Sequence, residues 1–340
     1  MIFCTAVIVF AVGSFIAIKI IYDSNFPRAD KPQFSNYLRF EDVPEYEKQV
    51  VQFKSGPNTL TGYLFGKGNN KGLVVVAHGL GGGTENYLQE IIYFVDQGWT
   101  VFAYDCTGSH ASEGKSTVGL AQSLLDLNAA LNYIKSREEL NRLPVMLFGH
   151  SWGGYAVAAV LNYDHPITAA VSVSGFNSPM DMLFEQAKRM MGGFTYVQYP
   201  FMWLYQTMLF GKSAWVSAVD GINKSGVPVM IIHGDKDNTI YYTGAAIIAH
   251  KNEITNPNVF YKTCSKEGHN GHSNLFYSEA AIMYRAIKNQ EYKELNERLG
   301  GEIPEDVKAA YYQEVDRFLW HQLDKAFMDD INHFFESALH

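Results

Sequence analysis

Gly149-His150-Ser151-Trp152-Gly153 is the stretch that decides the fold of this 340-residue chain. An apolar run at 143–148 precedes it, and small residues typical of a helix follow at 154–161. Strand, tight turn and helix, with a glycine two positions to each side of a serine, is the context that a nucleophile elbow requires. Small neighbours let strand and helix approach closely around a strained serine. The pentapeptide alone is weak evidence because short glycine patterns arise by chance, so the prediction depends on the rest of the chain.

The composition indicates a globular protein with a large core, since 47% of the residues are hydrophobic and 18% are charged. A chain of this length could hold two domains, although α/β folds of this size often form one. The net charge of −8 and the lack of any lysine-arginine block argue against a nucleic-acid partner. Cys4, Cys106 and Cys264 are scattered, which predicts neither a disulfide framework nor a zinc site.

The N-terminal segment differs in kind from the rest of the chain. Residues 2–21 are apolar except for Thr5, Ser14 and Lys19. Because about 20 residues of helix span a bilayer core of roughly 30 Å, we expect a retained single-pass membrane anchor over residues 1–21. A cleaved signal peptide, which would make the protein secreted, fits less well because no basic n-region or A-x-A-like site is present; a buried helix is a further alternative. Positive and negative residues alternate downstream, so the side of the membrane stays undecided.

The remainder divides into a linker and one domain. Residues 22–48 are polar and interrupted by prolines, which predicts a tether, and residues 49–340 form the domain. The hydrophobic patterns predict strands at 49–54, 59–65, 73–77, 100–104, 143–148, 169–173, 227–232 and 259–261, and helices at 85–96, 116–135, 245–250, 279–299 and 304–339. Apolar strands alternating with helices predict an α/β fold with a mostly parallel sheet of about eight strands, covered by helices on both faces.

Residues 177–226 interrupt this alternation, because they separate two expected strands by far more chain than a simple crossover needs. The segment is rich in methionine and aromatic residues. We interpret it as a helical lid over the serine, with adaptable side chains facing an apolar substrate. Alternatively, the same side chains form the packing core of the insertion itself.

A serine hydroxyl needs a base to take its proton and a carboxylate to orient that base. In a fold of this kind the chain order is serine, acid, histidine. Asp235 and Asp237 follow the expected strand at 227–232, and His269 and His272 follow the expected last strand. Both pairs lie at the carboxyl ends of strands, where open parallel sheets bind ligands. The residues alone leave open which member of each pair is used.

An oxyanion hole needs two backbone N–H groups that point at the developing negative charge. One is expected from Trp152, which follows the serine, and the other from Leu80 in the loop His78–Gly83. A glycine cluster after a strand also occurs in phosphate-binding loops, but the G-x-x-x-x-G-K-[ST] pattern is missing here.

The chain resembles serine hydrolases of the α/β-hydrolase superfamily, in the group with monoacylglycerol lipase-like, aminopeptidase-like and cinnamoyl-esterase-like members. The matching pieces are H-G-L-G-G at 78–82, D-C-T-G-S-H-A-S-E-G at 105–114, G-H-S-W-G at 149–153, H-G-D-K-D-N-T-I at 233–240 and G-H-N at 268–270. The resemblance implies Ser151 as nucleophile, Asp237 as acid and His269 as base, with His78 in a structural role. It implies no metal and no organic cofactor. Thr107 stands where arginine is common in the family, which leaves the pocket wall in doubt.

The expected function is hydrolysis of a small-molecule carboxylic ester with an acyl or aryl group, through an acyl-enzyme. An aminopeptidase-like or amide hydrolase is the alternative within the enzyme class, and it would need an anionic site for the substrate's α-amino group. A non-catalytic binding protein on a hydrolase fold is the alternative of another class. The sequence makes no prediction of the oligomeric state.

Overall fold

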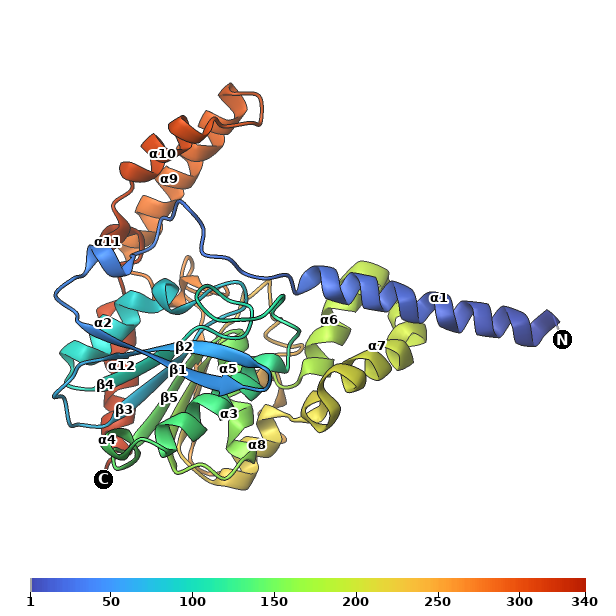
Figure 1. Ribbon diagram of the computed structural model, residues 1–340, viewed down its shortest axis with the longest axis horizontal. Coiled ribbons are helices and arrows are strands. Elements are labelled where there is room, and N and C mark those ends of the chain that lie inside the picture. The colour runs from blue at the N-terminus through green and yellow to red at the C-terminus, as the bar shows by residue number, and fades with distance from the viewer. Residues whose placement is uncertain (1) are drawn as a thin grey trace.

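Eight strands form one sheet in the order β1-β2-β4-β3-β5-β6-β7-β8 in the computed structural model, which describes residues 2–340 (Figure 1). Strand β2 pairs antiparallel with both of its neighbours, β1 and β4. All other neighbouring strands are parallel. The strands are β1 (Lys48–Ser55), β2 (Asn58–Phe65), β3 (Leu73–Ala77), β4 (Thr100–Tyr104), β5 (Val145–His150), β6 (Ile167–Val173), β7 (Val229–Gly234) and β8 (Val259–Cys264). The predicted fold class is confirmed.

The sheet is buried on both faces, as its continuous apolar strands require. In β3, Val75 packs into one core cluster, whereas Val74 and Val76 pack into the other. The first face is covered by α3 (Gln122–Lys135), α5 (Trp152–Ala159) and α8 (Ala218–Ser225), and the second by α2 (Leu88–Asp96) and α12 (Lys325–Ser337). A short helix, α4 (Glu138–Asn141), leads into β5.

Several predicted helices are shorter than expected. The helix expected at 116–135 begins at Gln122, because Val118 and Gly119 both have positive φ, at 61° and 157°. The helix expected at 304–339 is divided into α10 (Glu305–Gln313), α11 (Arg317–Trp320) and α12, since Asp316 and Asp324 each cap a new helix start. The helix expected at 245–250 is a single 3-10 turn, Ile247–His250. By contrast, α9 (Glu279–Arg298) occupies the expected residues.

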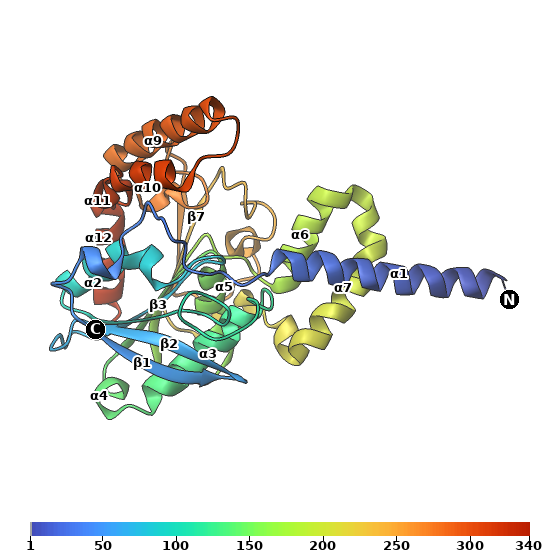
Figure 2. The same cartoon turned by 45° about the horizontal axis from the view of Figure 1, so that its top comes forward.

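The predicted lid segment contains two parts. Helices α6 (Pro179–Met191) and α7 (Thr195–Phe210) stand away from the sheet and lie around α1, and we call them the cap (Figure 2). Helix α8 lies in the predicted segment but packs against α5, where a Cβ on Gly221 would be 2.5 Å from the carbonyl oxygen of Ala158. This close approach makes α8 a covering helix of the sheet and not part of the cap.

Helix α1 (Ile2–Asn25) extends past the predicted anchor boundary at residue 21, and Met1 lies outside the described residues. Within residues 2–340, Phe3–Asn25 is the one helix long and apolar enough to cross a membrane. A membrane anchor and a signal sequence both have these properties. Its C-terminal half packs against the cap, and its N-terminal half projects from the molecule (Figure 1).

The predicted linker at 22–48 is not a free tether. The Arg28 guanidinium donates to the carbonyl oxygens of His110, Ser112 and Gly114, at 2.6, 2.9 and 2.8 Å. Farther along, Leu38 and Val43 are buried in the second core cluster. These contacts hold the segment along the domain surface.

Candidate active site

Ser151 lies on the turn between β5 and α5, with φ 58° and ψ −114°. A non-glycine residue at positive φ is uncommon and signals strain that the surroundings must impose. The surroundings do so, because a Cβ on Gly153 would be 2.0 Å from the carbonyl oxygen of Ala77. The Ser151 N–H also donates to the carbonyl oxygen of Val173 at 2.8 Å. The glycines of the pentapeptide are therefore needed for the close contact of strand and helix.

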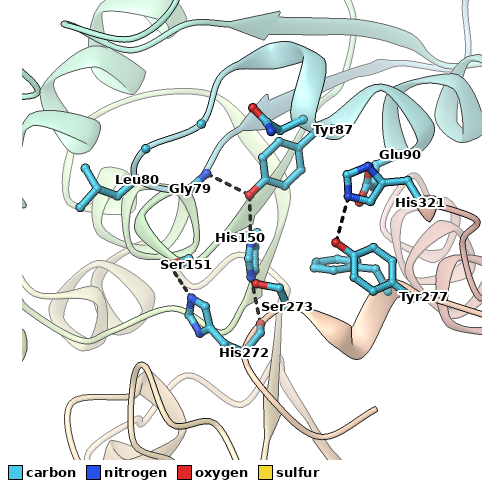
Figure 3. A pocket seen from close by; sticks show the side chains of 14 residues that line it. Gly79, Leu80, Tyr87, Glu90, His150, Ser151, His272, Ser273, Tyr277 and His321 are labelled. Carbon is cyan, nitrogen blue, oxygen red and sulfur yellow. Dashed lines mark hydrogen bonds between the residues drawn. The ribbon is translucent and has the colours of Figure 1, made fainter. Parts of the chain in front are cut away.

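The side chain that contacts the serine is His272. Its Nε2 lies 2.8 Å from the Ser151 hydroxyl (Figure 3), and its Nδ1 lies 2.7 Å from Oδ2 of Asp237. Because an ionised carboxylate only accepts hydrogen bonds, Nδ1 carries the proton and Nε2 is free to accept one from the hydroxyl. The arrangement can remove a proton from Ser151 and stabilise the imidazolium that results.

The prediction that His269 is the base does not agree with this geometry. Its Nε2 faces the start of α9, 3.2 Å from Oε1 of Glu279. The loop after β8 brings the carbonyl oxygen of Asn270 to the Lys236 N–H at 2.9 Å, and this contact turns the following residues towards the serine. His272, the competing candidate, is therefore the histidine that reaches the carboxyl edge of the sheet.

Asp237 occupies the predicted position of the acid and is buried. Oδ1 accepts the N–H groups of Thr239 and Ile240 at 2.8 and 2.9 Å, and Oδ2 lies 3.1 Å from Nε2 of His233. Burial opposes the charged form, but the hydrogen bonds from His233 and His272 outweigh it and hold the pKa of Asp237 well below its usual range. The carboxylate is therefore ionised when it contacts His272.

Asp235, the competing carboxylate, has a different environment. Its Oδ1 accepts a hydrogen bond from the Asn270 side chain at 3.0 Å, and its N–H donates to the carbonyl oxygen of Cys264. These contacts join the loop after β7 to the loop after β8. Asp235 thus shapes the two loops that carry Asp237 and His272.

Two residues that sequence reasoning did not single out connect the site. Tyr87 accepts the Gly79 N–H at 3.0 Å and donates to Nδ1 of His150 at 2.7 Å. Nε2 of His150 then donates to the carbonyl oxygen of His272 at 3.0 Å. Burial, with a smaller effect of nearby His272, lowers the pKa of His150 to about 3, which keeps this ring neutral. The chain of hydrogen bonds fixes the glycine loop and the His272 backbone relative to each other.

The residues predicted to form the oxyanion hole lie beside the serine. Leu80 lines the same cavity as Ser151, and Trp152 is the first residue of α5, where backbone N–H groups have no partner within the helix. His78 is buried and holds the preceding turn, with Nδ1 at 2.7 Å from the carbonyl oxygen of Gly79 and Nε2 accepting the Cys106 N–H at 2.9 Å. Its contacts agree with the structural role expected for it.

A polar cavity of about 280 Å³ opens beside Ser151. Figure 3 shows Ser151 and His272 on one side of it and Glu90, Tyr277 and His321 on the other. Glu90 is buried, and burial raises its pKa to about 7. No ion pair to Glu90 is recorded within residues 2–340. No sequence motif marks Glu90, because its position becomes informative only when α2 is placed against the cavity.

The described residues hold no cluster of three or more histidine, cysteine, aspartate or glutamate side chains arranged to bind a metal ion. Cys4, Cys106 and Cys264 are free thiols.

Comparison with known proteins finds similarity over part of the chain. A family model described as serine aminopeptidase S33 matches residues 68–204. The quorum-quenching protein AidA of Acinetobacter baumannii is 30% identical over 141 residues, 39% of this chain and 46% of AidA. The chain spans about half the length of the curated relatives it matches, AidA among them.

Two solved structures share the fold. The Pyrococcus furiosus esterase Pf2001 has a TM-score of 0.54 and 18% identity, covering 79% of this chain and 95% of the esterase. The Pyrococcus horikoshii acylaminoacyl peptidase has a TM-score of 0.52 and 16% identity, covering 81% of this chain and 46% of the peptidase. The sheet order, the strained serine turn and the two solved structures together show that this chain has the α/β-hydrolase fold, and the family match over residues 68–204 is to serine aminopeptidases.

Proposed function

We propose that the protein is a serine hydrolase that cleaves carboxylic esters, with Ser151 as nucleophile, His272 as general base and Asp237 as the orienting acid. One observation carries the proposal: hydrogen bonds of 2.8 and 2.7 Å connect the three side chains in sequence. The serine aminopeptidase match and the esterase and peptidase among the solved structures support hydrolytic chemistry. They leave the substrate open, because one fold serves many reactions.

In the proposed acylation, the Ser151 oxygen bonds to the ester carbonyl carbon while its proton passes to Nε2 of His272. The carbonyl oxygen becomes the oxyanion of a tetrahedral intermediate. When the intermediate collapses, the bond to the alkoxy oxygen breaks, and His272 returns its proton to the departing alcohol. The negative charge of Asp237 stabilises the imidazolium between these two transfers.

Deacylation repeats the same steps with water. His272 takes a proton from water, the hydroxide bonds to the acyl carbon, and the Ser151 oxygen leaves with the proton that His272 returns. The products are a carboxylic acid and the free enzyme. We assign the N–H groups of Leu80 and Trp152 to the oxyanion in both halves of the reaction, a contribution of about 3 kcal/mol for each donor.

We also propose that α1 stays attached as a single-pass membrane anchor. Ser14, Ile18 and Tyr22 are buried against the rest of the protein and repeat every four residues, so they lie on one face of the helix. Removal of α1 as a signal peptide would expose the apolar surface that this face covers. This packing favours retention of the helix over its cleavage.

A fluorophosphonate probe tests the reaction directly, because it reacts covalently with activated serines. We expect labelling of the wild type and none of Ser151→Ala. Ser273→Ala, a serine that lines the same cavity, is the matched control and keeps its labelling. A folded wild-type protein that is not labelled would contradict the proposal and would favour a non-catalytic binding protein.

A second candidate function, hydrolysis of amides with a free α-amino group, is favoured by Glu90. This carboxyl group lines the cavity that holds Ser151 and has the raised pKa expected of a buried acid without a cationic partner. An α-amino group bound in the cavity would supply that partner.

Aminoacyl anilides and p-nitrophenyl acetate distinguish the two candidates. If the amide reaction is the function, Glu90→Gln lowers kcat/KM for the anilides at least tenfold and leaves the acetate within about twofold. If the wild type hydrolyses esters but not anilides, the amide candidate is excluded and the ester proposal remains.

A further inference from the structure

A second cavity, of about 230 Å³, lies between α1 and the cap. Ile18 and Ile21 of α1 form one wall, and Met182 and Met190 of α6 form part of the opposite wall. Apolar side chains dominate this cavity, in contrast to the polar cavity beside Glu90. Unbranched thioether side chains adapt to flexible ligands, and aliphatic walls bind alkyl chains through the hydrophobic effect.

Leu80 joins the two cavities, because this residue lines both of them. The backbone N–H of the same residue is one of the two donors assigned to the oxyanion. An alkyl chain attached to the reacting carbonyl carbon would therefore have a direct route past Leu80 into the cavity between α1 and α6. The second cavity lies where the acyl part of an ester would continue.

Specific contacts hold α1 in place as a wall of this cavity. The Gln198 side chain donates to the Ser14 hydroxyl at 3.2 Å, and the Tyr22 hydroxyl donates to Oε1 of Gln206 at 2.6 Å. Polar side chains of this kind fix apolar helices against each other, since their unpaired alternatives in an apolar environment are costly. Tyr22 also lies over Gly119, where a Cβ would be 2.0 Å from the Tyr22 hydroxyl oxygen.

Many of the exposed large apolar side chains lie in the same region. Large apolar side chains on α7 are exposed, among them Trp203, Leu204 and Met208, and the exposed residues of α1 before Lys19 are mostly apolar as well. The part of α1 before Ser14, residues 2–13, would extend only about 18 Å at 1.5 Å per residue, which is short of the roughly 30 Å core of a bilayer. A bilayer crossed by α1 must therefore reach the cap and the cavity between them.

We propose that α1 is a wall of the substrate site, and that the cavity between α1 and α6 takes the acyl chain of an ester that resides in the membrane. The proposal rests on the proposed function for the reacting carbonyl group. Binding of the chain itself needs no turnover. It follows that a chain enters from the lipid side, and that each methylene group it buries raises its affinity about fourfold.

Adjacent isoleucines on α1 provide a matched pair of variants. Ile21 lines the cavity, whereas Ile20 is 63% exposed and does not line it. Ile21→Trp places a large side chain in the cavity, and Ile20→Trp adds the same side chain to the lipid-facing surface. The pair is made in the full chain carrying Ser151→Ala, reconstituted in phosphatidylcholine nanodiscs, so that no turnover occurs.

The probe is dodecanoic acid with a photoreactive diazirine on its chain, and cross-linked peptides are located by mass spectrometry. We expect cross-links within residues 18–26 and 182–191, reduced at least fivefold by Ile21→Trp and unchanged by Ile20→Trp. Cross-links confined to other segments, or equal yields from the two variants, would overturn the proposal. Loss of fluorophosphonate labelling in the wild type would refute the hydrolase and leave these cross-links unaffected, so the two failures are distinguishable.

Discussion

At the active-site edge, formed by the loops after β5, β7 and β8, the key side chains are joined by hydrogen bonds of 2.7 and 2.8 Å. In the cap, α6 and α7, the side chains that face solvent or α1 are mostly apolar, and many are exposed. The edge is anchored by eight paired strands, whereas the cap lies outside the sheet, where α7 packs against α1 and α6 is bound to the segment after β7.

The difference suggests a division of work between the two regions. Hydrogen bonds fix the positions of the side chains at the edge, and a chemical step depends on such precise placement of the reacting groups. Residues of the cap need only offer an adaptable apolar surface, which chain binding requires. Changes at the edge should therefore alter the rate for every substrate, and changes in the cap should alter the choice of substrate or the attachment of α1.

The largest effect is expected from His272→Ala, which removes the group at 2.8 Å from the Ser151 hydroxyl. Ester hydrolysis should fall about 10⁴- to 10⁶-fold in kcat, as for other triads. His269→Ala is the matched control and should stay within about threefold, since that ring faces Glu279. Steady-state kinetics with p-nitrophenyl butyrate measure both variants. The reverse result would restore His269 as the base.

The two histidines also show which part of the site could not be predicted from the sequence. The strands at 73–77 and 100–104 have the predicted bounds, because continuous β-branched and aromatic runs buried on both faces leave few alternatives. The choice between His269 and His272 depends on the path of one loop, which the contact of Asn270 with Lys236 determines. Local sequence does not encode such a contact between two separate loops.

The contacts that attach α1 to the rest of the protein could not be predicted from the sequence either. Its apolar length is plain in the sequence, but the residue that pairs with Tyr22 is Gln206, 184 positions farther along the chain. Glu90 gives a similar lesson, since a glutamate in an amphipathic helix is normally exposed. Only the packing of α2 against the cavity turns it into a buried acid.

Two glycines test the contrast in packing. At the edge, Gly153→Ala forces a methyl group against the carbonyl oxygen of Ala77, and we expect the free energy of unfolding to fall by about 3 kcal/mol. In the turn that joins the two cap helices, Gly193 has no heavy atom within 4 Å of the position of an added Cβ. Gly193→Ala should be neutral or stabilising by up to about 1 kcal/mol. Urea unfolding in detergent measures both variants. Equal losses in the free energy of unfolding would contradict the difference in packing between the edge and the cap.

A pair of glutamates tests the electrostatics of the edge. The pKa of Glu90 is raised by burial to about 7, so the folded protein binds an extra proton and loses stability as pH rises from about 4.5 to 7. Burial also opposes the charge of Glu85, but hydrogen bonds from Lys31, the Phe40 N–H and Arg39 outweigh it and lower that pKa. Glu85 therefore stabilises the protein above its unfolded pKa, and this contribution is lost as pH falls through its folded pKa.

The two glutamine variants should therefore respond to pH with opposite signs. Relative to the wild type, Glu90→Gln should be more stable at pH 8 by up to about 3 kcal/mol and similar at pH 4.5. Glu85→Gln should be less stable at pH 7, with the deficit shrinking in acid. Thermal unfolding across this pH range is the measurement. A Glu90→Gln curve parallel to the wild type would mean that the Glu90 carboxyl group already has a partner.

The smallest effect is expected where α1 meets the cap. Tyr22→Phe removes the hydroxyl that donates to Gln206, a fully buried side chain, and leaves that amide oxygen without its partner. The cost should be about 1 kcal/mol, because a single buried neutral hydrogen bond contributes little more. It should appear locally, as faster hydrogen exchange in α7 with unchanged exchange in β5 and β7. Tyr196→Phe, on the exposed side of α7, should change neither region. Faster exchange in the strands as well would mean that α1, the cap and the sheet unfold as one unit, and the division between edge and cap would then not hold.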